Sequence, residues 1–194
     1  GTNSNNYLDD IELRAIEPVE EPGCSIAISD LPYTENFDSY TTSTTARTEY
    51  RLDCWTLAHE DVTIPESERP QLYYRSDFAH SGNYSLFMSY RGIYAMPRLE
   101  ADVNALQMSL YVRQTNRQNQ LVVGVMSDLS DESTFVPVAT INNATTGVEH
   151  HTVDFSGYTG NGHYIAFRNI LASGYSGTNS NNYLDDIELR AIEP

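Results

Sequence analysis

A carboxylate near the C-terminus is the residue whose predicted placement most constrains the chemistry of this chain. Asp185 has the strand parity of Tyr183 and Ile187 in an alternating segment, which predicts that its side chain points toward the core. A buried carboxylate is costly unless it is paired or bound to a metal. Two alternatives stay open: Asp185 ligates Ca²⁺, which takes about six to eight oxygen ligands, or it accepts backbone hydrogen bonds or pairs with an arginine. Alternates for the same role are Asp186 and Glu35.

Tyrosines next to arginines are a second chemical feature. Sugar sites use exposed aromatic rings that stack on apolar sugar faces, beside polar groups that hydrogen-bond the edges. The alternative is that these tyrosines cover the rims and strand faces of an all-β domain. The single tryptophan, Trp55, is expected to pack in the core or rim rather than to form a platform. The candidate ligand-binding residues are Tyr73, Tyr74, Arg75, Tyr90, Arg91, Tyr94, Tyr175 and Asn181.

The sequence contains none of the HExxH, GxSxG or P-loop motifs of well-known catalytic classes. His150 and His151 are consecutive on one predicted strand, so their side chains point to opposite faces and cannot clamp one metal. The acidic run 128–132 lacks the glycine and glutamate positions of an EF-hand loop and is predicted to be a solvated turn. No motif places a histidine to activate Cys54. We therefore predict that the protein is not an enzyme.

Short alternating segments must position these groups, and turn residues separate them at intervals typical of a sandwich or barrel. The segment 121–126 is apolar on both faces and predicts a central strand. Pro137 cannot donate to a strand ladder, so its segment is predicted to be an edge strand or a bulge. Residues 98–105 are compatible with one turn of helix. The clearest alternating segments are 84–90, 106–113, 151–155, 163–168 and 183–189.

An internal duplication divides the chain. Residues 1–18 and 177–194 are identical at all 18 positions, with an offset of 176 residues. A period of this length exceeds the roughly 20–50 residues of solenoid repeats and fits whole domains in a tandem array. We interpret 1–18 as the terminal strand of a preceding repeat, 19–30 as a linker and 31–194 as the module. We expect the C-terminal copy to fill its own sheet, and the N-terminal copy to fray or to pair with a sheet edge, including that of a neighbouring molecule.

The charge and the cysteine content limit the partners and the cellular compartment expected for the protein. The formal net charge is −16 and all 11 basic residues are arginine, which disfavours binding to nucleic acid or to an anionic membrane. No stretch reaches the roughly 20 apolar residues of a membrane helix, so we expect no membrane insertion of this fragment. Cys24 and Cys54 lack metal-ligand spacing. They either form one disulfide in an oxidising compartment or remain two thiols, and the sequence leaves both alternatives open.

Several phrases, taken in order, resemble a known family. They are LPYTENFD at 31–38, Cys54-Trp55, HSGNYSL at 80–86, VGVMSD with STFVPV at 123–138, VDFSGYTGNGHYIAFRN at 153–169 and YLDDIEL at 183–189. Their order and spacing are similar to those of the cleaved-adhesin and choice-of-anchor modules of secreted bacterial surface proteins. Those modules are jelly-roll sandwiches related to galactose-binding-like and carbohydrate-binding domains. The resemblance implies an all-β, antiparallel β-sandwich of jelly-roll type.

The resemblance also implies a function and a metal. Many such jelly rolls hold a structural Ca²⁺ between the first and last strands, which here would use Asp38, Ser81, Asn83 and Asp185. Asp38 stands where glutamate is common, and its shorter side chain reaches less far. We predict a non-catalytic module of a tandem-repeat adhesin, secreted or on the cell surface, which binds a glycan or a host or cell-surface protein and contacts neighbouring repeats. The alternatives are a purely structural spacer and, third, a glycoside hydrolase-associated domain.

Overall fold

We analysed a computed structural model, which describes residues 24–40, 52–58, 71–88, 92–116, 119–171 and 181–193. The N-terminal copy 1–18 and the candidate ligand-binding residues Tyr90, Arg91 and Tyr175 lie outside the described residues. Across the described ranges, no helix is long and apolar enough to cross a membrane.

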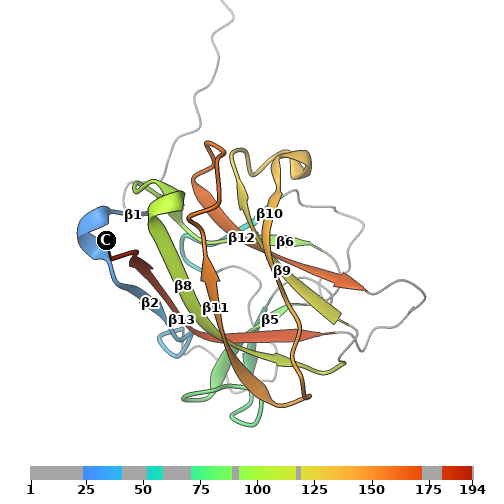
Figure 1. The fold of residues 1–194 in the computed structure, drawn as a ribbon. Coiled ribbons are helices and arrows are strands. Elements are labelled where there is room, and N and C mark those ends of the chain that lie inside the picture. The colour runs from blue at the N-terminus through green and yellow to red at the C-terminus, as the bar shows by residue number, and fades with distance from the viewer. Residues whose placement is uncertain are drawn as a thin grey trace, which may run out of the picture.

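In the described residues two larger sheets with antiparallel pairing form the sandwich predicted for a jelly roll, and β1 and β7 form a separate two-stranded parallel sheet. One sheet has five strands in the order β10-β9-β12-β6-β3, and the other has six, ordered β11-β8-β13-β5-β4 with β2 paired to β13. Figure 1 shows β8, β11 and β13 on one side of the molecule and β9, β10 and β12 on the other. The strands are β1 Ser25–Ile26, β2 Tyr33–Glu35, β3 Thr56–Ala58, β4 Gln71–Tyr74, β5 Tyr84–Met88, β6 Ile93–Ala95, β7 Arg98–Leu99, β8 Leu106–Gln114, β9 Asn119–Met126, β10 Val136–Ile141, β11 Val148–Asp154, β12 Tyr164–Leu171 and β13 Asn182–Ala191.

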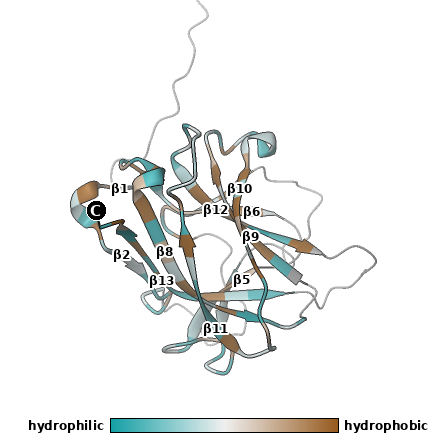
Figure 2. Cartoon of the chain, in the orientation of Figure 1, coloured by the Kyte–Doolittle hydropathy of each residue, from teal (hydrophilic) through white to brown (hydrophobic). Residues whose placement is uncertain are grey.

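The predicted alternation places side chains as expected along β8. Its residues alternate between buried and half-buried over the whole strand, because successive side chains point to opposite faces. The coloured cartoon shows the same alternation of apolar and polar positions (Figure 2). The apolar segment 121–126 lies in β9, which has β10 on one side and β12 on the other. The prediction of a central strand is therefore confirmed.

Local predictions about proline and tryptophan are also confirmed, whereas the predicted helical turn holds only for residues 103–105, because Arg98–Leu99 form the strand β7. Pro137 lies in β10, at the edge of its sheet, where the register with β9 shifts between Pro137 and Ala139. Trp55 is buried and its ring packs on those of Phe37 and Tyr94. The predicted helical turn within 98–105 is a short 3-10 helix, η3. The described 3-10 helices are η1 Ile28–Asp30, η3 Val103–Ala105 and η4 Glu132–Thr134.

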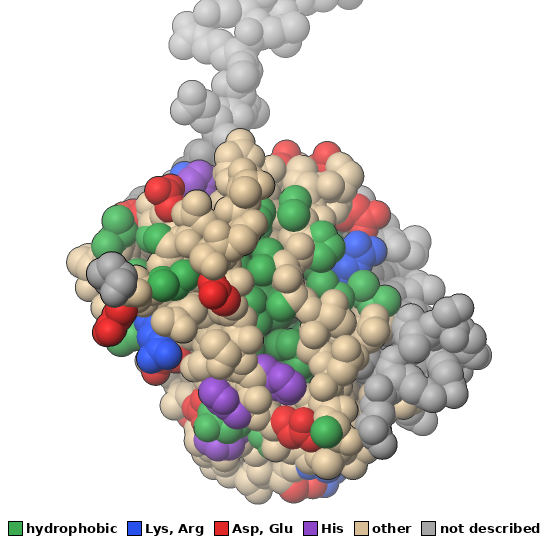
Figure 3. Space-filling view, in the orientation of Figure 1, with side chains coloured by type: hydrophobic (Ala, Val, Ile, Leu, Met, Phe, Trp, Pro, Cys, Tyr) green, Lys and Arg blue, Asp and Glu red, His purple; other side chains and the backbone are tan. Residues whose placement is uncertain are grey.

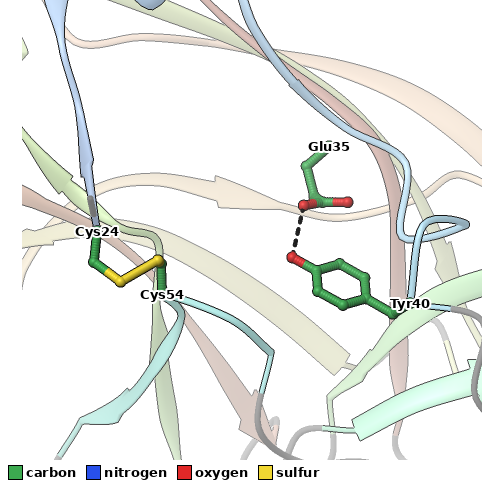
Figure 4. Close-up of a disulfide and its surroundings, with 4 residues drawn as sticks. All are labelled: Cys24, Glu35, Tyr40 and Cys54. Carbon is green, nitrogen blue, oxygen red and sulfur yellow. Dashed lines mark hydrogen bonds between the residues drawn. A yellow bond between two sulfur atoms is a disulfide. The ribbon is translucent and has the colours of Figure 1, made fainter. Parts of the chain in front are cut away.

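A disulfide joins the segment before β1 to the segment before β3. Cys24 and Cys54 are bonded across a sequence separation of 30 residues, so the alternative of two thiols is wrong (Figure 4). β1 pairs in parallel with β7, and Ile26 is buried in the main core. The described part of the segment interpreted as a linker is therefore packed against the module.

The predicted parity of the last strand is wrong, because the register of β13 with β8 shifts between Asp185 and Glu188. Asp186 lies in this irregularity with a φ of 43°, and an extra residue at a bulge reverses the faces of the positions around it. Ile187 belongs to the main core, whereas Tyr183 belongs to a separate cluster with Tyr73 and Phe87. Asp185 therefore shares a face with Tyr183 and not with Ile187.

Candidate functional site

The loop between β4 and β5 is fastened at both ends by carboxylates from distant parts of the chain. We call this arrangement the loop latch; it comprises residues 80–84 and the side chains of Asp38, Asp185 and Asp186. Asp185 Oδ2 accepts hydrogen bonds from the backbone N–H groups of His80 (2.6 Å) and Ser81 (3.0 Å). Its Oδ1 accepts the N–H of Asp186 at 2.8 Å. One buried carboxylate therefore satisfies three backbone donors.

Asp38 fastens the other end of the loop. Its Oδ1 accepts the backbone N–H groups of Asn83 (2.9 Å) and Tyr84 (3.2 Å). Between the two anchors, Gly82 adopts a φ of +55°, in the left-handed region where glycine carries no Cβ penalty. A Cβ at this position would overlap the Asp38 carboxylate. The phrase HSGN is thus explained by geometry: the glycine permits the turn and the close approach of Asp38.

Burial gives Asp185 an unusual titration. The side chain is almost fully buried, and desolvation, together with the neighbouring charge of Asp186, raises the pKa of Asp185 to about 6. The three N–H donors act in the opposite direction, since they stabilise the ionised form. Glu35, the alternate candidate, is also buried, and burial raises its pKa. Glu35 accepts the backbone N–H of Phe37 (2.7 Å) and the hydroxyl of Tyr40 (3.2 Å; Figure 4).

The four predicted calcium ligands do converge on the loop latch, but through N–H donors. Ca²⁺ needs a shell of oxygen ligands, whereas the groups that point at Asp38 and Asp185 are backbone N–H groups of the loop. In the part of the chain that the structure describes, no group of three or more His, Cys, Asp or Glu side chains is placed to hold a metal ion. This geometry by itself assigns no calcium site, and calcium stays a prediction.

Three rings lie next to the loop latch on the outer face of the six-stranded sheet. We call His80, Tyr111 and His150 the ring platform. The His80 ring stacks on that of Tyr111 with centroids 3.4 Å apart and planes at 9°. Tyr111 and His150 are cross-strand partners on β8 and β11, and their ring centroids are 4.9 Å apart. Figure 3 shows histidine side chains gathered on this face, toward the lower end of β11.

Polar groups hold and flank the ring platform. His80 Nδ1 lies 2.6 Å from Asp186 Oδ2, and the Ser81 hydroxyl donates to Asp186 Oδ1 at 2.8 Å. The His80 side chain is 40% exposed and that of Asp186 is 25% exposed, so both are accessible to a ligand. A flat ring face beside a fixed carboxylate and a hydroxyl is the combination that stacks on a sugar ring and hydrogen-bonds its edge.

The predicted tyrosines that the structure describes, Tyr73, Tyr74 and Tyr94, pack against other aromatic rings of the protein. Tyr94 is 1% exposed; its ring stacks on Trp55, and its hydroxyl accepts the N–H of Leu52 at 3.0 Å. Tyr73 is buried and packs on Phe78, and Asn181 is buried. The half-buried Tyr74 packs on Tyr84, while the exposed Arg75 pairs with Asp77.

Sequence reasoning missed the ring platform. The sequence patterns include Tyr111 only within the alternating segment 106–113, and His80 only within the phrase HSGNYSL. The outward parity of Tyr111 and His150 on predicted strands was a usable signal for two of the three rings. The stacking of His80 on Tyr111 joins residues that are far apart in sequence, so no local pattern contains it.

Comparison with known proteins supports the fold. No family model matches the chain, and no curated protein matches it. Among solved structures, the K1 cleaved adhesin domain of Lys-gingipain from Porphyromonas gingivalis W83 matches with a TM-score of 0.58 and 16% identity, over 83% of this chain and 98% of that one. This chain has the fold of a cleaved adhesin domain. The K2 cleaved adhesin domain of Lys-gingipain agrees, with a TM-score of 0.55 and 16% identity over 81% of this chain and 98% of that one.

A xylan-binding domain of carbohydrate-binding module family 22 is a weaker match to the cleaved-adhesin fold seen here. Its TM-score is 0.46 with 13% identity, over 82% of this chain and 93% of that one. At 13–16% identity these similarities concern the fold.

Proposed function

We propose that this chain is a non-catalytic adhesion module of a secreted or cell-surface protein, and that it binds a glycan at the ring platform. The observation that carries the proposal is the stack of His80 on Tyr111 beside Asp186, held at an accessible surface. A hydrogen bond to Asp186 and a ring stack on Tyr111 fix the imidazole in advance, so little conformational entropy is lost when a ligand binds. The adhesin-type fold is consistent with this role.

The charge of the site selects among glycans. The chain carries a formal net charge of −16, and the carboxylate of Asp186 and the hydroxyl of Ser81 lie beside the ring platform. Both can accept hydrogen bonds from sugar hydroxyls, whereas a sulfated or sialylated glycan would meet like charge. We therefore expect neutral, hydroxyl-rich glycans to bind in preference to anionic ones.

The nearby carboxylates have structural roles, which argues against catalysis. Glycoside hydrolysis needs one carboxyl group as acid and another as base or nucleophile. Asp185 is occupied by three backbone N–H groups, and both oxygens of Asp186 bond to His80 and Ser81. The Ser81 hydroxyl bonds to the carboxylate and not to the imidazole, so this trio lacks the nucleophile–base contact of a hydrolytic triad.

A glycan array with wild type and three variants tests the proposal. We expect His80→Ala and Tyr111→Ala to lower binding of the wild-type ligand at least about tenfold, since stacking and its hydrogen bonds contribute roughly 1.5 kcal/mol or more. Val136→Ala removes an exposed apolar side chain from the other sheet and should bind normally. The backbone N–H of His80 that fastens the loop latch is retained in His80→Ala, so the fold should be unchanged. Equal binding by all four proteins would refute the assignment of the site.

A structural spacer is the second candidate. It is favoured by the packing of Tyr73 and Tyr94, which removes two of the predicted binding tyrosines from the surface. A folded wild-type protein that binds no glycan on neutral and anionic arrays would support this candidate over the first.

A further inference from the structure

The last strand occupies an internal position in its sheet. β13 pairs with β8 on one side, and with β5 and β2 on the other. Its side chains complete the main core through Leu184, Ile187 and Leu189. Without this strand, both neighbours would have unpaired backbone groups and the core would be open, so the molecule needs a strand in this position. We call the position the last-strand slot.

Contacts specific to this sequence hold the strand in the slot. Asn182 Oδ1 accepts from Gln114 Nε2 at 2.8 Å, and Asn182 Nδ2 donates to Asn169 Oδ1 at 2.8 Å. All three amides are buried. Gln114 and Asn182 lie on β8 and β13 of the six-stranded sheet and Asn169 lies on β12 of the five-stranded sheet, so these hydrogen bonds link the two sheets. Asp185 fastens the loop latch in the same strand. A strand of another sequence would leave these buried groups unsatisfied.

The chain carries a second segment that meets every one of these demands. Residues 6–15 have the same ten amino acids as Asn182–Ala191. Asn6 corresponds to Asn182 and Asp9 to Asp185, and the apolar positions correspond in the same way. The contacts of the last-strand slot therefore cannot distinguish the copies, and the choice between them depends only on how each is connected.

The two connections are nearly equal in length. Residues 172–181 lead from β12 into β13, ten residues, whereas residues 16–24 would lead from the N-terminal copy to β1, nine residues. Loop closure depends on length through a power of about −3/2, so this difference changes the relative occupancy by less than about twofold.

The N-terminal connection also ends near the exit of the last-strand slot. The Ile192 N–H donates to the Ala105 carbonyl at 2.8 Å, and the Glu100 N–H donates to the Ile26 carbonyl at 3.1 Å. The exit of β13 and strand β1 thus contact one short segment, 100–105, and Figure 1 shows the C-terminus beside β1 and η1. A nine-residue connection spans up to about 30 Å when extended. With this connection the N-terminal copy would enter the slot in the same direction as β13.

We propose that the last-strand slot is a strand-exchange site whose alternative ligand is residues 6–15 of the same chain. Exchange leaves the contacts of the folded module unchanged and releases residues 182–191. The proposal goes beyond glycan binding and does not depend on it. In the structure the C-terminal copy fills the slot, as expected; the proposal adds that the N-terminal copy can take its place, because the two connections are nearly equal in length.

Disulfide trapping in the full chain tests the proposal. Arg190 lies opposite Gln107 in the register of β13 with β8, and Arg14 is its counterpart in the N-terminal copy. Cys24 and Cys54 are already joined, so two introduced thiols react with each other. We expect Gln107→Cys to form an intramolecular crosslink with Arg190→Cys and also with Arg14→Cys, in yields within about threefold. Asn3→Cys, out of register, is the matched control for random collision.

Two outcomes would overturn the proposal: a crosslink with Arg190→Cys alone, or an Arg14→Cys product that consists only of covalent dimers.

A truncated chain of residues 1–176 gives a second measurement. We expect it to stay folded and monomeric, with a near-UV circular dichroism spectrum like that of residues 19–194. Adding Leu8→Asp, at the counterpart of the buried Leu184, should abolish cooperative unfolding of 1–176. An unfolded 1–176 beside a folded 19–194 would contradict the proposal.

Discussion

Replacing Gly82 by alanine should destabilise the protein through one identifiable contact. Gly82 has a φ of +55°, and an alanine in this left-handed region costs about 1 kcal/mol. The added Cβ would also overlap the Asp38 carboxylate and displace it from two backbone N–H groups, at about 1 kcal/mol each. We expect Gly82→Ala to lower the free energy of unfolding by about 3 kcal/mol.

A double-mutant cycle separates the contact from the backbone effect. Asp38→Ala alone should cost about 2 kcal/mol, since it removes the two hydrogen bonds. In the Asp38→Ala background nothing remains for the Cβ to displace, so Gly82→Ala should cost only about 1 kcal/mol there. The double variant should therefore be about as stable as Gly82→Ala alone.

Urea unfolding with the disulfide intact is the assay. At an m-value of about 2 kcal/mol/M, a loss of 3 kcal/mol lowers the midpoint by about 1.5 M. Gly157→Ala is the matched control, because a Cβ at Gly157 has no atom within 4 Å. Equal costs of Gly82→Ala with and without Asp38 would refute the reasoning, since they would show that the two residues do not interact.

Three further predictions concern Asp185, calcium and His151. Asp185→Ala removes the acceptor of three backbone N–H groups and should cost about 3 kcal/mol at pH 7 by urea unfolding; a loss below 1 kcal/mol would contradict this. Excess chelator tests the calcium prediction. A lower melting temperature that Ca²⁺ restores would support a bound ion, whereas an unchanged melting temperature would contradict the calcium prediction. Burial lowers the pKa of His151, so its protonation favours the unfolded state, and its contribution to stability should be lost as pH falls below about 6.5. His151→Gln should show a smaller drop in stability between pH 7.5 and 5 than wild type; an equal or larger drop would show that His151 does not carry this dependence.

The predictions that succeeded rest on local chemistry. Alternation along 106–113 is a property of the strand itself, so it indicated the buried face of β8 without knowledge of its neighbours. Proline lacks an N–H group wherever it lies, which predicted the edge position and register shift at Pro137. The order of family phrases added the sandwich of jelly-roll type.

The predictions about the site fared less well, because they depend on contacts between distant segments. Parity failed at Asp185, where the register shift reverses the faces of β13. Tyrosine composition could not tell Tyr94, which is packed on Trp55, from Tyr111, which lies on the outer face. The pairing of Cys24 with Cys54 was open until their separation in space was known.

The sequence by itself therefore determined the strand pattern and the sandwich, and it revealed that one strand exists in two identical copies. The family phrases also implied that Asp38 and Asp185 meet at the loop of Ser81 and Asn83. Tertiary structure alone decided that these carboxylates accept backbone N–H groups of that loop, that Asp186 lies beside His80, and that His80 stacks on Tyr111. The physical reason is range: periodicity and turn chemistry act between neighbours in the chain, whereas a hydrogen bond or ring stack between residues far apart exists only after the sheets have assembled.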